Sequence, residues 1–337
     1  MIPKKQLEKI KKELEECQNP FFFFHDDMDG LCSFLLLYRF KREGKWHMVK
    51  QRPFIEERFT GFVPEDCDKV FVLDIATIDQ EFVNKIKKPV VWIDHHTPQK
   101  LSNVEYFNPR IKHPDEYTPV SAICYKALNQ DLLIGSIGTT GDLSPQPYLK
   151  KFFKEYARLV GKHRDLFELT FETKFGKLIR ILEMNLKGKT ADIKKALVIF
   201  SRTKDFTSFL EPKTKDEKFV YERYEKIIND YESILKEAYK VKGDPFIFRY
   251  QEGEITFGSD LGREIPYRIP GKKMYIIYRE KSGRMLCSLR SHKINLVKFL
   301  ENAFTKVDGY GGGHPVAVGC NINKDDFDKF IELAKNA

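Results

Sequence analysis

The sequence predicts an α/β protein with three parts: an N-terminal doubly wound parallel-sheet domain, a helical connector and a smaller C-terminal α/β domain. Apolar runs alternate with helical patterns through the first 140 residues, which is typical of a parallel sheet with helical crossovers. Two of these runs, residues 21–24 and 90–93, are apolar at every position, as strands buried on both faces are. A chain of 337 residues also exceeds what one core usually serves, so two domains are expected.

The N-terminal elements follow in order. A helix over residues 4–17 places Leu7, Ile10 and Leu14 on one face, and Asn19-Pro20 ends it before the first strand. The same reasoning predicts further strands over residues 46–54, 69–73, 90–93 and 104–107, and helices over 31–40, 82–86, 120–128 and 132–140.

From Pro147 to about Lys242 the pattern is almost wholly helical, most clearly over residues 216–240, and Gly243-Asp244-Pro245 marks a boundary. Beyond it, we expect strands over residues 246–250, 273–278, 285–289 and 316–320, and helices over 296–304 and 325–334. The expected domains are a catalytic domain over residues 1–190, a connector over 191–243 and a second domain over 244–337.

Composition excludes some classes of protein and leaves others open. No apolar run is long enough to span a membrane, and the chain starts with a charged helical pattern instead of a secretory signal. Six scattered cysteines without a C-x-x-C pair favour reduced thiols in a cytoplasm. A net charge of +9 and a pI near 9.0 permit binding to a polyanion, although charged residues at 32%, rich in Lys and Glu, also suit a thermophile.

Polar residues stand where the predicted elements end, and these are the candidate site residues. In an open α/β sheet, ligands bind beyond the carboxyl ends of the strands. An extended segment would place residues 25, 27 and 29 on one side of the chain. The candidates are His25, Asp27, Asp29, Asp74, Asp94, His95, His96 and Asp142.

The chemistry of this set indicates metal ions. Asp27 and Asp29, held close together, would repel each other unless cations or protons neutralised them. Nitrogen and oxygen ligands together fit Mn²⁺, with Mg²⁺ as the alternative. Six or seven ligands are too many for one ion and suit two that share a bridging carboxylate. Two metals about 3.5–4 Å apart clamp the attacking and leaving oxygens of a phosphoryl displacement and activate a water.

In these residues the chain resembles the DHH/DHHA1 phosphoesterases, over most of its length. The matching motifs are His25-x-Asp27-x-Asp29-Gly30, Asp74, Asp94-His95-His96, Gly141-Asp142 and Gly311-Gly312-Gly313-His314. The resemblance implies two Mn²⁺ ions, one held by His25 and Asp27, the other by Asp29, His95 and Asp142, with Asp74 as the bridge. It further implies that Asp94 orients His95 and that His96 meets the scissile phosphate, which makes Asp74, Asp94 and His96 the catalytic candidates.

The C-terminal domain carries the candidate substrate-binding residues Arg290, Gly311, Gly312, Gly313 and His314. Three glycines without Cβ atoms let backbone N–H groups approach a phosphate, and His314 adds a donor; a plain turn is the alternative. Arg290 lies in a segment that looks like the family's DHHA1 pattern and could grip a phosphate bidentately; an ordinary surface arginine is the alternative.

The resemblance gives the reaction class more firmly than the substrate. Size and composition look most like the small archaeal RecJ-like nucleases, including the Hef-associated type, which implies 3′→5′ exonuclease action on single-stranded DNA or RNA. The alternatives are an oligoribonuclease that also cleaves nucleotide bisphosphates, and a non-catalytic replication scaffold. A repair or replication helicase partner and a homodimer are expectations of the same kind, as is a cytoplasmic location.

Overall fold

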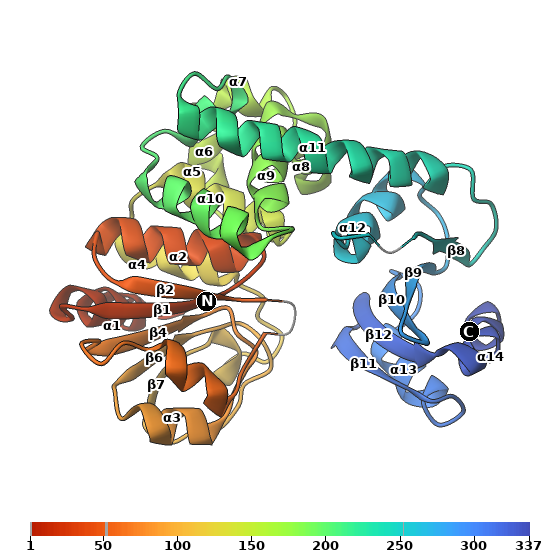
Figure 1. The fold of residues 1–337 in the computed structure, drawn as a ribbon, viewed down its shortest axis with the longest axis horizontal. Helices are drawn as coiled ribbons and strands as arrows, with labels where there is room; N and C mark the ends of the chain where they lie inside the picture. The colour runs from red at the N-terminus through yellow and green to blue at the C-terminus, as the bar shows by residue number, and fades with distance from the viewer. Residues whose placement is uncertain (1, 51–52, 252) are drawn as a thin grey trace. The chain divides into compact units, whose positions relative to one another are not determined.

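The computed structural model describes residues 2–50, 53–251 and 253–337 (Figure 1). The chain divides into two compact units, one ending at Glu222 and the next beginning at Arg223. Among the described residues, none of the helices has the length and apolar run that a bilayer crossing needs.

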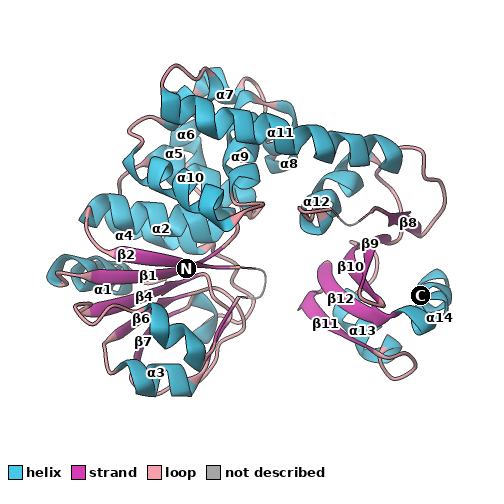
Figure 2. Cartoon of the chain, in the orientation of Figure 1, coloured by secondary structure: helices cyan, strands magenta, loops and turns pink. Residues whose placement is uncertain are grey.

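The first unit is built on a five-stranded parallel sheet in the order β2-β1-β4-β6-β7, and Figure 2 shows its strands in magenta. Its strands are β1 (Pro20–His25), β2 (Lys45–Val49), β4 (Lys69–Leu73), β6 (Val90–Ile93) and β7 (Val104–Phe107). The order places β1, β4 and β6 side by side, so their carboxyl ends meet at one edge of the sheet.

The phenylalanine run explains why β1 is an interior strand. Phe22 and Phe24 pack on Phe34 of helix α2 (Met28–Lys41), which covers one face of the sheet. Phe21 and Phe23 point to the other face, where they join the apolar cluster that includes Phe82 of α3 (Gln80–Ile86). Successive strand residues face opposite ways, so apolar residues at every position require cover on both faces. The expectation of a doubly wound sheet is confirmed.

The other helices of this unit follow the expected pattern closely. The helices are α1 (Lys4–Glu16), α4 (Val120–Leu128), α5 (Leu132–Gly141), α6 (Leu149–Glu155), α7 (Ala157–Val160), α8 (Leu166–Glu172), α9 (Lys174–Asn185) and α10 (Thr190–Arg202), with short 3₁₀ turns η1 (Glu57–Phe62), η2 (Pro109–Ile111) and η3 (Phe206–Leu210). Helix α11 (Lys215–Ala238) contains the boundary between the two units.

Two expectations for the N-terminal half are wrong in detail. The strand predicted over residues 46–54 is instead two strands, because β2 ends at Val49 and β3 (Phe54–Ile55) pairs with β5 (Thr77–Ile78) in a separate sheet; residues 51 and 52 lie outside the described part. Pro53 lacks an N–H group and cannot extend the β2 ladder. The segment after β1 is not extended either, since Asp27 is the N-cap of α2 and Asp29 lies in its first turn.

The second unit contains a five-stranded sheet in the order β11-β12-β10-β9-β8, antiparallel except for the parallel pair β8–β9. Alternate residues of β9 and β10, such as Ile276 and Leu289, join a cluster with α13 and α14, while the opposite face contacts α12. The elements are β8 (Phe246–Arg249), α12 (Gly258–Arg268), β9 (Tyr275–Lys281), β10 (Arg284–Arg290), α13 (Leu296–Ala303), β11 (Gly309–His314), β12 (Ala317–Asn323), η4 (Lys324–Asp326) and α14 (Phe327–Lys335).

Two features of this unit differ from the expectations. Helix α12 was not predicted, because Gly258, Gly262 and Pro266 weaken its helical pattern. Gly262 lets α12 lie close to β10, since a Cβ atom there would lie 2.8 Å from Ser288 Oγ. The glycine run, expected as a phosphate-binding loop with a plain turn as the alternative, is the edge strand β11, because it pairs along its length with β12.

Candidate metal centre

Three neighbouring strands deliver the core of the candidate site. His25 ends β1, Asp74 follows β4, and Asp94 follows β6. The backbone N–H of Asp74 donates to Ile93 O at 3.0 Å, which ties the ends of β4 and β6 together. Asp74 has a φ of 56°, a left-handed conformation that aspartate tolerates better than most residues and that is common at functional sites.

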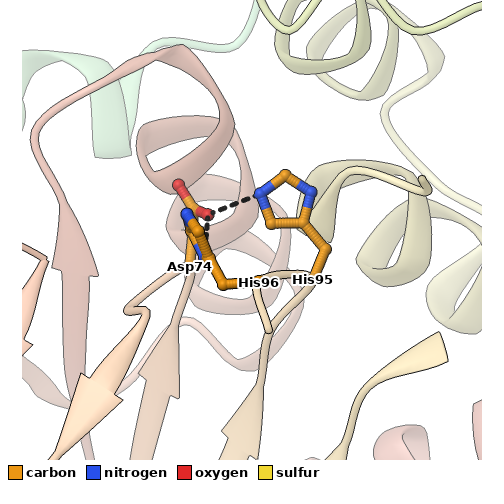
Figure 3. A group of neighbouring side chains, drawn as sticks. All are labelled: Asp74, His95 and His96. Carbon is orange, nitrogen blue, oxygen red and sulfur yellow. Dashed lines mark ion pairs between the residues drawn. The ribbon is translucent and has the colours of Figure 1, made fainter. Parts of the chain in front are cut away.

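Asp74 lies at the centre of the cluster. Its Oδ1 is 3.3 Å from His95 Nε2 and 3.9 Å from His96 Nδ1, the group drawn in Figure 3. Its Oδ2 is 3.7 Å from His25 Nδ1, which also lies 2.8 Å from Asp27 Oδ2. The carboxylate therefore faces imidazoles from two sides, as the expectation of a bridging ligand requires.

Two helix ends complete the cluster. Asp27 caps α2 by accepting from the Gly30 N–H at 2.9 Å, and Asp142 is the C-cap of α5, with its Oδ2 4.0 Å from His95 Nδ1. A Cβ atom on Gly30 would lie 2.4 Å from the carbonyl oxygen of His25, so this turn requires glycine.

Asp29 is held by the N-terminus of helix α4. The backbone N–H groups of Val120 and Ser121 donate to its two oxygens at 2.7 and 2.8 Å, and the Ser121 hydroxyl also donates to Oδ1. The positive end of the α4 dipole stabilises a buried carboxylate at this point. A ligand atom of Asp29 still lies within 4.8 Å of those of His95 and Asp142.

The cluster offers three overlapping sets of ligand atoms. Within each set, the atoms lie within 4.8 Å of one another. The sets are Asp74, His95 and His96; His25, Asp27 and Asp74; and Asp29, His95 and Asp142. All six residues expected as metal ligands are thus brought together, with Asp74 and His95 each shared by two sets.

Carboxylates and imidazoles packed closely together shift the pKa values of the cluster. Burial alone would raise the pKa of Asp74, but the neighbouring imidazoles of His25 and His95 hold it far below its ordinary value. Burial would lower the pKa of His95, yet Asp74 and Asp142 raise it to about 10. Burial, together with the charges of Asp27 and Asp74, raises the pKa of Asp142. A divalent cation bound among these groups would take the place of protons on the imidazoles.

Buried polar atoms without a hydrogen bond indicate whether these residues fit a metal. Within the described part of the chain, Asp74 Oδ1 and His95 Nδ1 are buried without a hydrogen-bond partner. Leaving a buried polar atom unpaired is costly, so such atoms indicate a missing ligand. Carboxylate and imidazole donors in this number suit Mn²⁺ or Mg²⁺. The donor set and the two unpaired atoms fit the expected metals.

The expected partner of Asp94 is wrong. Asp94 Oδ1 lies 2.7 Å from His96 Nδ1, and Asp94 Oδ2 accepts from the His96 backbone N–H at 2.9 Å. Asp94 therefore orients His96 and not His95. A residue two positions along the turn can close this pair of bonds, whereas His95 points its Nε2 at Asp74.

Several supporting residues were not predicted. Asn108 donates to Asp94 Oδ2 at 3.2 Å, and the Tyr117 hydroxyl donates to Asp142 Oδ2 at 3.0 Å. Ser121 donates to Asp29 Oδ1 from its backbone N–H and from its hydroxyl. None of the three stands in a recognisable motif, and each reaches the site only through the folding of a loop or a helix end.

The substrate-binding candidates lie in the second unit. Arg290 ends β10 and donates from Nη1 to Ser288 Oγ at 3.0 Å and to Leu289 O at 2.8 Å. Burial and the nearby Arg263 of α12 lower its pKa to about 10, so it remains charged at neutral pH. Arg263, which the sequence analysis missed, thus places a second cation beside it.

The glycines of β11 are not equivalent. A Cβ on Gly311 would lie 2.4 Å from Gly319 O, and one on Gly313 would lie 2.5 Å from Ala317 O, so strand pairing requires both. A Cβ on Gly312 would meet nothing within 4 Å among the described residues. Gly312 is therefore the one position of the run where packing within the strand pair does not explain the glycine, and His314 ends the strand.

Comparisons with known proteins show a similar fold. The structure is similar to RecJ from Thermus thermophilus in complex with Mn²⁺, with a TM-score of 0.68 and 16% identity over 99% of this chain and 55% of that one. It is also similar to exonuclease RecJ bound to manganese, with a TM-score of 0.64 and 16% identity over 99% of this chain and 94% of that one. The Mg²⁺ complex of the Thermus protein gives a TM-score of 0.61 and 16% identity, over 98% and 52% of the two chains.

The chain spans about half the length of the Thermus RecJ that it matches. Among curated proteins, none matches the sequence. The DHH family N-terminal domain matches residues 21–143, and the DHHA1 domain matches residues 264–337; together they cover more than half of the chain. The first match contains every candidate metal ligand, and the second contains Arg290 and the glycine run. The chain therefore belongs to the DHH/DHHA1 phosphoesterase family.

Proposed function

We propose that this protein is a phosphodiester hydrolase that removes nucleotides from the end of single-stranded DNA or RNA with two divalent metal ions. The observation that carries the proposal is the convergence of six metal-ligand candidates at the ends of β1, β4 and β6, with Asp74 Oδ1 and His95 Nδ1 left unpaired. The relatives in complex with Mn²⁺ and Mg²⁺, one of them named an exonuclease, support the choice of metals and of an exonuclease.

The assignment of ligands follows the three sets of atoms. By two of these sets, His25 and Asp27 would hold one ion, Asp29, His95 and Asp142 would hold the other, and Asp74 would be the ligand shared by both ions. Such a pair of ions, when bound, lowers the pKa of a water and neutralises the charge of the phosphate oxygens. The protein keeps the ligand residues in place through the α2 cap on Asp27 and the α4 N-terminus on Asp29.

His96 is assigned to the phosphate. Its ring is fixed through Nδ1 by Asp94, and Asn108 in turn holds Asp94. Burial would lower the pKa of His96, but Asp94 and Asp74 raise it, which favours a protonated ring that can donate to a phosphate oxygen through Nε2. The ring is thus placed to stabilise negative charge that grows during cleavage.

In the second unit, Arg290 and the outer edge of β11 bind the terminal nucleotide. Among the described strands, β11 pairs with β12 alone, so alternate backbone N–H groups of the glycine run point away from the sheet and are available to an anion. The 3′→5′ direction, a helicase partner and a homodimer also belong to this proposal.

Degradation of end-labelled strands tests the function. With Mn²⁺, a 3′→5′ exonuclease shortens a 5′-labelled single strand to a ladder and releases one labelled mononucleotide at once from a 3′-labelled strand. A duplex of the same sequence stays intact. The reverse pattern of labels would contradict the direction, and rapid cleavage of dinucleotides with little cleavage of a 20-mer would identify the short-oligonucleotide enzyme. An Asp74→Ala variant that degrades the strand as fast as the wild type would contradict the assignment of the site.

A further inference from the structure

Beyond the candidate metal centre, the first unit contains a pocket of about 670 Å³ at the outer edge of its sheet. The edge strand β2 forms one side, with Trp46 and His47, while Phe62 of η1 and Lys194 of α10 lie on the others. Trp46 packs against Phe34 of α2, whereas His47 packs against the η1 aromatics, so the pocket includes residues from both faces of the strand. Its volume falls in the usual range for small-ligand sites, about 300–1,000 Å³.

The aromatic side of the pocket is an exposed ring held in place. Phe62 is 48% exposed, and its ring stacks on that of His47 with the centroids 3.7 Å apart and the planes at 27°. Phe59 supports both rings at centroid distances of 5.8 Å. Burial and the charge of Lys194 lower the pKa of His47 to about 4, so this stack is uncharged at neutral pH. A large exposed aromatic ring of fixed orientation is a typical platform for a nucleobase.

The charged side chains among the described residues that line the pocket are all positive. The described residues that line it include four cations, Lys45, Lys50, Arg58 and Lys194, and no carboxylate. Lys45 and Arg58 have neighbouring acidic partners outside the lining, at 3.7 and 3.0 Å. Lys50 donates to the Thr190 hydroxyl at 3.3 Å, and neither Lys50 nor Lys194 pairs with a carboxylate in the described part of the chain. Uncompensated cations beside an aromatic platform match a base linked to phosphate.

The position of the pocket links it to the candidate metal centre. Strand β2 lies next to β1 in parallel register, with Val49 opposite His25, a candidate metal ligand. Lys50 is the next residue after Val49. Neighbouring strands lie about 4.8 Å apart, and the four steps from Lys45 to Val49 extend about 13 Å along the strand. The pocket therefore runs along β2 towards the carboxyl ends of the strands, where the candidate ligands converge.

We infer that this pocket is a second binding site for a nucleotide, with the base stacked on Phe62 and the phosphate held by Lys50 and Lys194. Such a site would hold a single strand at a distance from the position of cleavage, and in that role it rests on the proposed function. The same chemistry would also hold a free nucleotide, and an acidic peptide added to the β2 edge is the competing occupant.

Tryptophan fluorescence measures occupancy of this pocket directly. The chain contains two tryptophans, of which Trp46 lines the pocket, while Trp92 is fully buried in the core. The full chain is titrated in EDTA, so that binding is measured without hydrolysis, with a single strand of roughly 10 nucleotides. We expect saturable quenching. Phe62→Ala should weaken the affinity about tenfold, the scale of losing one stacked base. The exposed Tyr239→Ala serves as a control and should leave it unchanged.

The charge is tested with two lysines on the same helix. Lys194→Gln should weaken binding at low salt and lose its effect at high salt. Lys195→Gln is the matched control, because Lys195 Nζ lies 3.8 Å from the Phe219 ring centroid and does not line the pocket. Equal effects of the two substitutions would show a general surface charge and overturn the site.

Titrations with different ligands distinguish the possible occupants of the pocket. Tighter binding of the strand than of uridine monophosphate supports a strand-binding site, and equal affinity supports a free-nucleotide site; both support the inference. Quenching by a glutamate-rich peptide with the affinity of the strand, or an unchanged affinity in Phe62→Ala, would contradict it. Because the titration requires no catalysis, quenching in a protein that hydrolyses no strand would contradict the proposed function and leave this site standing.

Discussion

Asp94 and His96 form a closed pair: the Asp94 carboxylate lies 2.7 Å from the ring Nδ1 and accepts from the His96 backbone N–H at 2.9 Å. Two bonds to one carboxylate fix both the main chain and the ring of His96. The catalytic assignment of His96 thus depends on a residue that touches neither the metals nor the phosphate in our account.

Substitution of Asp94 tests this pairing. Asp94→Asn keeps the size of the side chain but removes the charge that raises the pKa of His96. We expect kcat to fall by about 10–100-fold, the usual cost of losing such a supporting carboxylate, while the affinity for Mn²⁺ stays within a few-fold. His96→Gln should cause a similar loss, and the double variant should be little worse than either single one. Loss of Mn²⁺ binding in Asp94→Asn would place Asp94 among the metal ligands instead.

Substitutions at two neighbouring glycines of β11 distinguish a role in strand packing from a role in substrate binding. Gly312→Ala adds a methyl group in open space, so we expect an unchanged melting temperature and a higher KM for single strands. Gly311→Ala forces a Cβ to 2.4 Å from Gly319 O and should lower the melting temperature. Thermal unfolding and steady-state kinetics of the two variants provide the comparison. A Gly312→Ala variant with wild-type KM would remove Gly312 from the substrate site.

Arg290 is expected to bind the end of the strand. Arg290→Ala should cost about 1–3 kcal/mol in binding, the scale of a lost charge-assisted hydrogen bond. Short oligonucleotides have few other contacts, so kcat/KM on a 3-mer should fall more than on a 20-mer, and the defect should persist at high salt. An equal loss on both lengths that disappears at high salt would make Arg290 a general electrostatic contact.

His47 predicts a pH dependence of stability. Its pKa is about 4 in the folded protein against an ordinary 6.5, so the unfolded chain binds more protons between these values. His47 should therefore reduce stability as pH falls from 6.5 to 4 and have no such effect above 6.5. Urea unfolding of His47→Phe and of the exposed control His292→Phe, at pH 5 and pH 8, measures this. The wild type and the control should lose more stability at pH 5 than His47→Phe does; equal losses in all three proteins would show that His47 titrates normally.

The sequence predicted correctly those features that depend on a local pattern of apolar and polar residues. The uniformly apolar β1 and β6 predicted interior parallel strands, and their polar ends predicted the place of the site. The same reasoning brought His25, Asp27 and Asp29 together for the wrong reason. They meet because Asp27 caps α2 through Gly30 and because Asp29 accepts hydrogen bonds from the start of α4. The second contact joins residues 91 positions apart, which no local pattern predicts.

Other features depend on tertiary context in the same way. Helix α12 has two glycines and a proline, yet it forms because Gly262 lets it lie against Ser288. The glycine run reads as a turn until β12 is available to pair with it. The pocket beside β2 combines a strand, a 3₁₀ turn and a helix that are distant in sequence, so only the folded chain shows it.

The proposed hydrolysis depends on a centre for two divalent metals built around Asp74. Isothermal titration with Mn²⁺ measures it most directly, comparing the wild type with Asp74→Ala and with the exposed control Asp328→Ala, after circular dichroism has shown that all three are folded. We predict two bound Mn²⁺ ions for the wild type and the control. For Asp74→Ala we predict at most one weakly bound ion, together with loss of strand hydrolysis. Two tightly bound ions in Asp74→Ala, or fewer than two in the wild type at saturation, would contradict the account.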